Sequence, residues 1–265
     1  MLTLYHHNIS VCAQKVRMVL AEKNVPWEGR HVDLETGEQL KPEYLRIHPK
    51  GFVPALVHDD YTIIESTLIC EYLDDVFPDP PLKPKHPGAV ARMRLWPKAV
   101  DDGLHFAIGS ISHTAAFMPQ LKKTMSVAEI EERMKRMPDK ARSARQLELL
   151  RKGLDAQFVR DALRLYDKSI GEMEAALDNG PWLAGAQFTL ADIALIPYIE
   201  RLDRLGLSRF WKPSRPKVGA WLGRMRARPS FASAIAAFAP VGIFTDMIEA
   251  QGIELWPQVE KALTD

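Results

Sequence analysis

The stretch at residues 50–77 reads KGFVPALVHDDYTIIESTLICEYLDDVF and decides the fold. It predicts a short apolar strand after Pro54, a tight turn, a second strand, and a helix that Glu65 and Ser66 open. Proline lacks an N–H group and belongs at a strand start or edge, where an extended main chain stays free to pair with another. The N–H groups at a helix start suit a carboxylate. The stretch therefore predicts a site for a small peptide-like molecule.

The residues before this stretch alternate between strand and helix patterns. Apolar periodicity predicts strands at 2–7 and 27–33 and a helix at 11–24, while residues 40–47 form either a short helix or an irregular segment. In the helix at 11–24 the inner face is expected to contain Val16, Val19 and Leu20. Residues 1–80 are therefore predicted to form an α/β domain with a mixed sheet.

A proline-rich segment, PDPPLKPKHP at 78–87, continues neither helix nor sheet and is interpreted as a linker. Residues 88–265 are predicted to form an all-helical second domain. Within it, Thr189 and Asp192 are expected to cap a helix. Residues 119–152 are rich in charged side chains and only weakly amphipathic. We therefore expect a mobile insertion there.

Composition excludes several classes of protein. The 265 residues are 46% hydrophobic and 26% charged, with a net charge of +1, so no nucleic acid or membrane partner is expected. The charge is uneven, with 7 Lys/Arg against 13 Asp/Glu up to residue 80 and 28 against 21 beyond. The two cysteines, Cys12 and Cys70, form no disulfide framework and no metal-ligand spacing. With no signal-peptide pattern and no long apolar stretch, we expect a cytoplasmic protein without a metal.

Ser10 precedes the helix predicted at 11–24, where the helix dipole is positive. It fits two interpretations: a helix N-cap, or a hydroxyl that donates a hydrogen bond to a thiol anion. The usual capping-box partner is missing, because Ala13 stands where Glu or Gln would be. In the second interpretation the hydroxyl and the dipole together lower the thiol pKa, which activates the sulfur as a nucleophile. Cys12, in the first turn, is either a thiol activated in the same way or a small buried residue.

Ser66 is expected to be the N-cap of a helix at 67–77. Together with Glu65 it also suggests a second charged group on the ligand. A carboxylate beside a helix start pairs with an ammonium, while the helix N–H groups take a neighbouring carboxylate. An ammonium beside a carboxylate is the amino-acid end of a γ-glutamyl group. Val53 and Pro54 are expected to supply main-chain pairing, most usefully through a cis peptide bond. Lys50 is either a solvated loop lysine or the partner of a far carboxylate.

Four motifs resemble those of cytosolic glutathione transferases, and together they span nearly the whole chain. They are SVCAQKVRMVLAEK at 10–23, VPAL at 53–56, ESTLICEYLDDVFP at 65–78 and FTLADIALIPYIERL at 188–202. The resemblance implies a thioredoxin-like N-terminal domain plus an all-helical C-terminal domain. It also implies a homodimer, a detoxification role and glutathione as co-substrate.

The resemblance assigns the sulfur and backbone contacts of glutathione to particular residues. Ser10 matches the family's catalytic serine, and Cys12 matches the cysteine of the Ser-x-Cys pattern in zeta-like members. Val53 and Pro54 match the cis-proline segment that pairs with the cysteinyl backbone.

The two ends of glutathione are assigned in the same way. Glu65 and Ser66 match the pair that holds the γ-glutamyl group, and Gln39 and Lys50 fall near residues that contact the glycine carboxylate. Phe52 departs from the pattern, because several serine classes place Lys or Gln just before the Val-Pro pair. The glycine end is therefore open to a different mode of binding.

The function implied by the resemblance is enzymatic. A glutathione thiolate attacks an apolar electrophile, by conjugation or by ether cleavage, as in bacterial β-etherases, which carry a similar expansion at 119–152 and a similar third-helix motif. One alternative is reductive dehalogenation or thiol–disulfide chemistry through Cys12. The other alternative is a non-catalytic glutathione-binding protein of the same fold.

Overall fold

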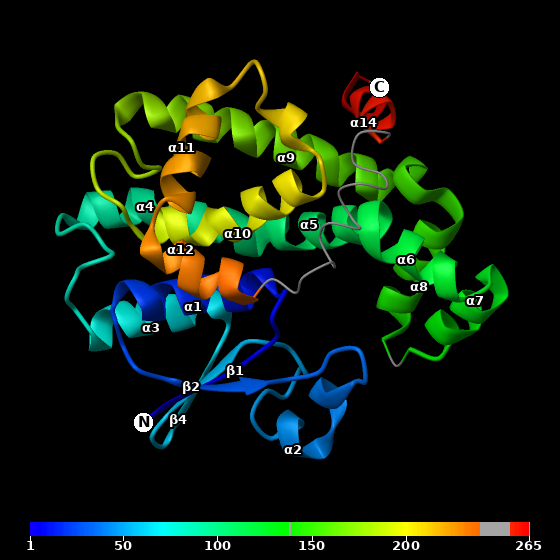
Figure 1. The fold of residues 1–265 in the computed structure, drawn as a ribbon, viewed down its shortest axis with the longest axis horizontal. Coiled ribbons are helices and arrows are strands. Elements are labelled where there is room, and N and C mark those ends of the chain that lie inside the picture. The colour runs from blue at the N-terminus through cyan, green and yellow to red at the C-terminus, as the bar shows by residue number, and fades with distance from the viewer. Residues whose placement is uncertain (138, 239–254, 265) are drawn as a thin grey trace. The chain divides into compact units, whose positions relative to one another are not determined.

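The computed structural model describes residues 1–137, 139–238 and 255–264, and Figure 1 traces the chain. By compactness the chain divides into two units. The first contains Met1–Asp101, Ala175–Ile199 and Gly219–Pro240, and the second contains Asp102–Glu174, Glu200–Val218 and Val241–Asp265. These units follow packing and not the order of the chain, so the domain boundary expected at the proline-rich linker stays a prediction.

A four-stranded sheet with the order β2-β1-β3-β4 lies at the centre of the N-terminal domain. Strands β1 (Leu2–His6) and β2 (Glu28–His31) are parallel, whereas β3 (Ala55–His58) is antiparallel to β1 and to β4 (Tyr61–Ile64). A parallel pair needs a crossover connection, and helix α1 (Val11–Glu22) supplies it. The predicted mixed sheet is confirmed.

Helix α1 packs beside α3 (Ser66–Val76), and Figure 1 shows both on the same side of the sheet. A 3-10 turn at Glu38–Leu40 leads to the short helix α2 (Pro42–Leu45), which lies on the other side (Figure 1). The predicted inner face of α1 is confirmed, because Val16, Val19 and Leu20 are all buried. The same helix also buries Lys15 and Arg17, which its periodicity did not predict.

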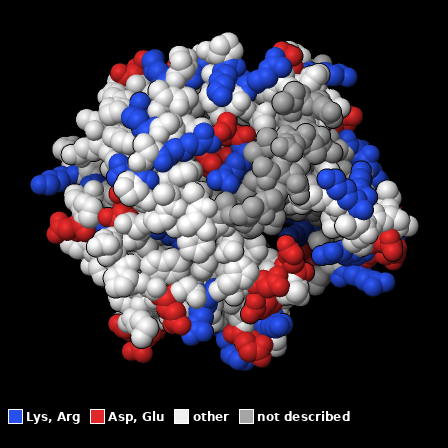
Figure 2. All heavy atoms as spheres, viewed as in Figure 1, with Lys and Arg blue, Asp and Glu red and all other residues white. Residues whose placement is uncertain are grey.

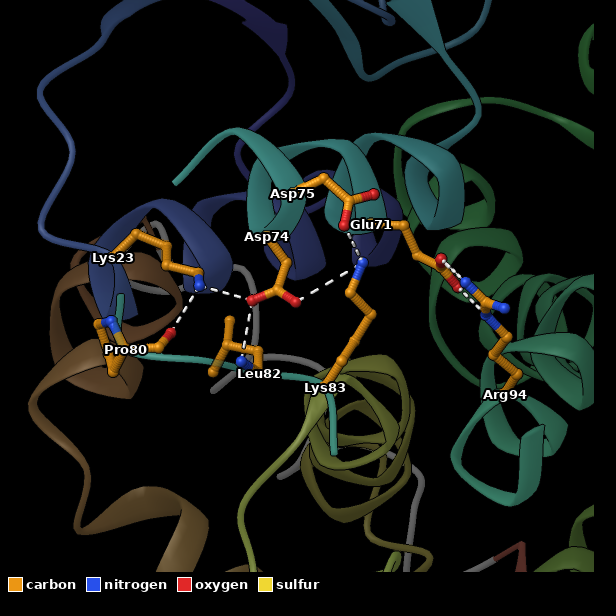
Figure 3. Close-up of polar contacts among 8 residues, drawn as sticks. All are labelled: Lys23, Glu71, Asp74, Asp75, Pro80, Leu82, Lys83 and Arg94. Atoms are coloured by element: carbon orange, nitrogen blue, oxygen red, sulfur yellow. Dashed lines mark hydrogen bonds and ion pairs between the residues drawn. The ribbon is translucent and has the colours of Figure 1, made fainter. Parts of the chain in front are cut away.

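A buried ion pair attaches the proline-rich linker to α3, as Figure 3 shows. Lys23 Nζ donates to Asp74 Oδ1 and to the carbonyl of Pro80, each at 2.5 Å. The same Asp74 oxygen accepts from the N–H group of Leu82 at 2.8 Å. The side chains of Lys23 and Asp74 are only 0% and 4% exposed, so each charge depends on the other for solvation.

Helix α4 (Pro87–Ala99) follows the linker and is also held by α3. Arg94 donates to both carboxylate oxygens of Glu71, at 2.8 and 2.5 Å (Figure 3). Helix α10 (Leu190–Arg204) begins at the linker as well, because the N–H group of Leu190 donates to the carbonyl of Leu82 at 2.9 Å. Helices α11 (Pro216–Arg226) and α12 (Pro229–Ala234) follow.

The predicted cap of α10 is confirmed. Asp192 accepts from the N–H group of Thr189 at 3.0 Å, and from the N–H group of Leu183 and the indole Nε1 of Trp221 at 2.9 Å each. Burial raises the pKa of Asp192 to about 6. These bonds satisfy the carboxylate that the cap places inside the protein.

The second unit is helical in its described part. A π-helical turn at Val100–Leu104 leads into α5 (His105–Ser112), and a second π-helical turn at His113–Phe117 leads into α6 (Met118–Thr124). Then come α7 (Val127–Lys135), α8 (Lys140–Lys152) and α9 (Gln157–Ala176).

The segment at 119–152, predicted to be a mobile insertion, forms helices in the structure. Helices α7 and α8 bury Ile130, Met134 and Leu149, and Ser126 begins α7 with a complete capping box. Figure 2 shows Lys and Arg gathered over this segment. The prediction of a mobile segment was wrong because α7 and α8 each bury few positions, and many of their other residues are charged.

The last helix that the structure describes is α14 (Trp256–Thr264), and residues 239–254 and 265 lie outside the described residues. Among the helices that the structure describes, none combines the length and the apolar character needed to cross a membrane. Over the same described ranges, no three His, Cys, Asp or Glu side chains are grouped so that they could hold a metal ion.

Candidate functional site

One end of the sheet gathers the three segments that the sequence singled out. Tyr5 near the end of β1 lies opposite Ala55 at the start of β3, and Ala55 in turn lies opposite Ile64 at the end of β4. The loop that leads to α1 follows this end of β1, the proline segment directly precedes β3, and α3 begins directly after β4. The antiparallel register therefore brings the predicted sulfur, backbone and γ-glutamyl contacts to one edge.

Ser10 is the N-cap of α1. Its backbone is extended, with φ −66° and ψ 118°, and its Oγ accepts the N–H group of Ala13 at 3.3 Å. A hydroxyl that accepts one hydrogen bond still has its own proton to donate. The N-cap and the thiol-anion interpretations of Ser10 are therefore compatible, and the position has the positive helix dipole that a thiolate needs.

The loop before Ser10 is held by the buried guanidinium of Arg17. Its nitrogens donate to the carbonyls of Asn8 at 2.9 Å, His7 at 3.3 Å and Ala234 at 2.8 Å. The N–H group of Ser10 donates to the same His7 carbonyl at 3.2 Å. Burial lowers the pKa of Arg17 to about 9. Arg17 thus joins the loop before Ser10 to the end of α12.

Cys12 lies one position into α1 and is half-buried. Its Sγ is 3.7 Å from the hydroxyl oxygen of Tyr198, a fully buried residue of α10. Cys70 is a core residue, and burial raises the pKa of its thiol to about 12. Of the two thiols, Cys12 is the more exposed, and it lies two residues after Ser10.

The Val53-Pro54 peptide bond is cis, as predicted. The residue before it is fixed, because the Tyr44 hydroxyl donates to the carbonyl of Phe52 at 2.6 Å. The N–H group and the carbonyl of Val53 make no hydrogen bond to any residue that the structure describes. An extended main chain with one free donor and one free acceptor is what a peptide backbone can pair with.

The start of α3 offers a site for a carboxylate. Glu65, and not Ser66 as expected, is the N-cap, because the chain turns one residue earlier with φ 67° at Glu65. No side chain caps this helix, and in the described chain the N–H groups of Ser66, Thr67 and Leu68 have no acceptor. Three free donors at the positive end of an 11-residue helix suit an anion.

Lys50 lies in a loop beside this helix start, and Gln39 lies in the 3-10 turn of a neighbouring loop. Lys50 Nζ is 3.2 Å from Glu65 Oε1, and its N–H group donates to Nδ1 of the buried His48 at 3.3 Å. Burial lowers the pKa of His48. A Cβ on Gly51 would lie 2.8 Å from the carbonyl oxygen of Gln39, so the two loops touch. The side-chain oxygen of Gln39 is buried with no partner among the described residues.

Sequence reasoning missed Lys15, Arg17, Thr67 and Tyr198, which touch or support the predicted residues. One signal was present: Lys15 and Arg17 flank Val16 in a helix whose faces are otherwise mostly apolar. A basic side chain that must be buried there needs polar partners, which points to a polar network inside the domain.

Comparison with known proteins gives matches over both halves of the chain. Residues 9–76 match the family model of the glutathione S-transferase N-terminal domain, and residues 140–224 match that of the C-terminal domain. Protein LigF of Sphingobium sp. strain SYK-6 is 31% identical over 236 residues, which are 86% of this chain and 91% of LigF.

Two solved structures extend the likeness to three dimensions. The crystal structure of β-etherase LigF matches with a TM-score of 0.77 at 30% identity, over 89% of this chain and 99% of LigF. A glutathione transferase homologue from Sulfitobacter, solved with bound glutathione, matches with a TM-score of 0.65 at 25% identity. That match covers 89% of this chain and 98% of the homologue.

Proposed function

Because this chain belongs to the glutathione S-transferase family, we propose that glutathione binds at the sheet end described above, with its sulfur at Ser10. The protein is a glutathione transferase, and glutathione is its co-substrate. The observation that supports the location is the register of β1, β3 and β4, which puts three ligand-ready segments at one edge.

Each part of glutathione has a partner in this proposal. The cysteinyl backbone pairs with the free main-chain groups of Val53 beside Pro54. The γ-glutamyl carboxylate takes the N–H groups at the start of α3 together with the Ser66 hydroxyl, and its ammonium pairs with Glu65.

The glycine end remains to be placed. Lys50 exchanges its contact with Glu65 for the glycine carboxylate, and Gln39 donates to that carboxylate from its amide nitrogen. The same proposal assigns a role to each of the two predicted domains. Residues 1–80 form the glutathione-binding domain, and residues 88–265, with an insertion at 119–152, form the domain that binds the second substrate.

The chemistry begins at the thiol. Glutathione's sulfur loses its proton to water, because the Ser10 hydroxyl and the N-terminus of α1 both stabilise the anion. The thiolate then forms a carbon–sulfur bond as the bond from that carbon to the leaving group breaks. The leaving group departs with the bonding electrons and takes a proton from water. The enzyme contributes the lowered thiol pKa and the positioning of both reactants.

We expect Ser10→Ala to lower kcat/KM for conjugation about 10- to 100-fold, the value of one hydrogen bond to a charged sulfur. The pKa of bound glutathione, followed by thiolate absorbance during a pH titration, is expected to rise by about one to two units. Cys12→Ala is the matched variant and is expected to change both quantities less. The reverse order would assign the chemistry to the cysteine.

An aryl ether is the second substrate that we propose. The relative LigF is a β-etherase, and the family likeness to it covers most of both chains. Ether cleavage uses the same thiolate, with a phenolate as the leaving group. A panel of β-aryl ethers and halogenated aromatics, assayed for release of phenol or halide with glutathione present, tests the choice. Turnover of halogenated aromatics alone would contradict it.

The alternative chemistry through Cys12 is favoured by one observation, the 3.7 Å contact between its sulfur and the Tyr198 hydroxyl. A hydroxyl donor there would stabilise a Cys12 thiolate, which could attack a glutathione disulfide or a glutathionyl intermediate. Mass spectrometry of the intact protein after turnover distinguishes the two chemistries. A glutathione adduct on Cys12 that forms and decays during turnover would favour this alternative.

We also propose a homodimer in the cytoplasm. Exposed apolar side chains on the first unit, among them Phe52, Leu68 and Leu95, support a partner surface. Both cysteines are free thiols, which suits a reducing compartment.

A further inference from the structure

Three side chains from three elements form a continuous polar chain behind the start of α3. Lys15 of α1 donates from Nζ to Thr67 Oγ1 at 3.2 Å. Thr67, the second residue of α3, donates from Oγ1 to Asp101 Oδ1 at 3.0 Å. Asp101 lies in the π-helical turn that follows α4.

The chemistry of the three groups fixes the direction of these hydrogen bonds. An ammonium can only donate and an ionised carboxylate can only accept, so the hydroxyl must accept from Lys15 and donate to Asp101. Both bonds are charge-assisted, which makes them stronger than bonds between neutral groups. Lys15 is 1% exposed and has no carboxylate partner among the described residues, so it depends on Thr67.

These three hydrogen-bonded side chains connect the two helix starts of the proposed site. Lys15 is on the helix that Ser10 caps, and Thr67 directly follows Glu65 and Ser66. A cavity of about 10 Å³ beside Lys15 and Thr67 has room for no more than one water molecule. The buried end of this series of hydrogen bonds, at Lys15, therefore has no space for a ligand. The three residues act only through the helices that they join.

We propose that Lys15, Thr67 and Asp101 form a positioning chain that fixes the start of α3 relative to the start of α1. One tripeptide then meets Ser10 with its sulfur and Glu65 with its γ-glutamyl end at the same time. The inference rests on the proposed glutathione site, and it adds three residues that set the affinity for glutathione without touching the reacting sulfur.

Thr67→Val tests the chain, because valine keeps the shape of threonine and removes the hydroxyl. We expect the Kd for glutathione, measured by isothermal titration calorimetry, to rise about tenfold, the value of a charge-assisted hydrogen bond. Thr67→Ser restores the hydroxyl and is expected to bind within about twofold of the wild type. Thr62→Val removes an exposed hydroxyl from β4 and is expected to leave the Kd unchanged.

Two further measurements distinguish a role in positioning glutathione from a general loss of enzyme function. In Thr67→Val the KM for glutathione is expected to rise while kcat and the pKa of the bound thiol stay at their wild-type values. Should Thr67→Val fail to fold, Asp101→Asn takes its place, since Asp101 is exposed and its loss leaves the core intact. That variant is expected to raise the Kd in the same direction.

An unchanged Kd in Thr67→Val, or in Asp101→Asn where it replaces Thr67→Val, would overturn the positioning chain. A Thr67→Ser variant as weak as Thr67→Val would do the same. These outcomes leave the proposed function intact provided that the wild type binds glutathione. A wild type that shows no binding at millimolar glutathione would instead overturn the proposed site, and the positioning chain with it.

Discussion

Glu65 serves the proposed site through both its backbone and its side chain. Its φ of 67° is in a region that side chains rarely adopt, at a cost on the order of 1–3 kcal/mol. The turn that this conformation makes leaves three N–H groups of α3 without acceptors in the described chain. The carboxylate, meanwhile, lies within reach of Lys50. A strained residue kept at a helix start is consistent with a role in binding.

Glu65→Gln is expected to weaken glutathione binding about tenfold, because an amide oxygen replaces the charged partner of the γ-glutamyl ammonium. The thiol pKa of bound glutathione is expected to stay unchanged, since the proposed position of the sulfur is at the start of the other helix, α1. Calorimetry at constant ionic strength measures the first quantity and thiolate absorbance the second. Glu43→Gln, an exposed glutamate of α2, serves as the control. Equal affinities of Glu65→Gln and the control would contradict the assignment.

His6 gives the stability of the protein a dependence on pH. Burial, with a smaller contribution from Arg17, lowers its pKa from 6.5 to about 4. The unfolded chain therefore takes up this proton near pH 6.5, whereas the folded chain takes it up only near pH 4. The stabilisation is complete above pH 6.5 and is lost as the pH falls towards 4. Its size is on the order of 3 kcal/mol.

In His6→Gln we expect a smaller fall in the free energy of unfolding between pH 7.5 and pH 5, measured by urea denaturation. His48 and His113 also have pKa values lowered by burial, so part of the dependence remains in the variant. A variant with the same pH dependence as the wild type would show that His6 titrates normally.

At the scale of elements, the proline-rich linker depends on α3. Composition alone predicts a break in regular structure at 78–87 but not what holds it. Asp74 accepts from Lys23 and from the N–H group of Leu82, so one buried carboxylate fixes both the end of α1 and the linker (Figure 3).

Asp74→Ala is expected to lower the free energy of unfolding by about 3–5 kcal/mol, because it leaves the ammonium of Lys23 buried without its counter-charge. Its neighbour Asp75 also pairs with a lysine but is 68% exposed, so Asp75→Ala is expected to cost less than about 1 kcal/mol. Denaturation in guanidinium chloride at neutral pH compares the two. Similar losses in both variants would mean that burial does not set the strength of the Asp74 pair.

Most elements of the N-terminal domain were predictable, because each has a local signal. Pro54 marks a strand start, and the two helix starts have a capping residue or an acidic residue before an apolar run. Helices α7 and α8 were not predicted as ordered, since charged side chains occupy half of their positions. Local periodicity does not reveal burial that depends on a neighbouring helix.

At the scale of the whole molecule, contacts between residues far apart along the chain could not be predicted from the sequence. Glu65 could be proposed from its local context, but the contact of Lys15 with Thr67 spans 51 intervening positions. The hydrogen bond from Thr67 to Asp101 depends in addition on where α4 places the residues that follow it. A lysine in an amphipathic helix is normally exposed, so only the structure shows that this one is buried.

The wild-type protein is expected to be a dimer in size-exclusion chromatography with light scattering. Leu68 of α3 and Leu95 of α4 are 60% and 64% exposed, although large apolar side chains usually find cover. Leu68→Glu would place a charge in that surface, and a shift towards monomer is expected at micromolar concentration. Thr62→Val, on β4, is the control. A monomeric wild type would contradict the homodimer.

The hydrogen bond from Arg17 to the carbonyl of Ala234 joins residues 217 positions apart. A ribosome adds about 5–20 residues per second, so roughly 10–45 s separate the synthesis of its two partners. The sheet and the first helix emerge early, but the loop before Ser10 gains its last anchor only near the end of translation. We therefore expect a nascent chain stalled before α12 to have a loosely held loop before Ser10, and the enzyme to become active only as synthesis ends.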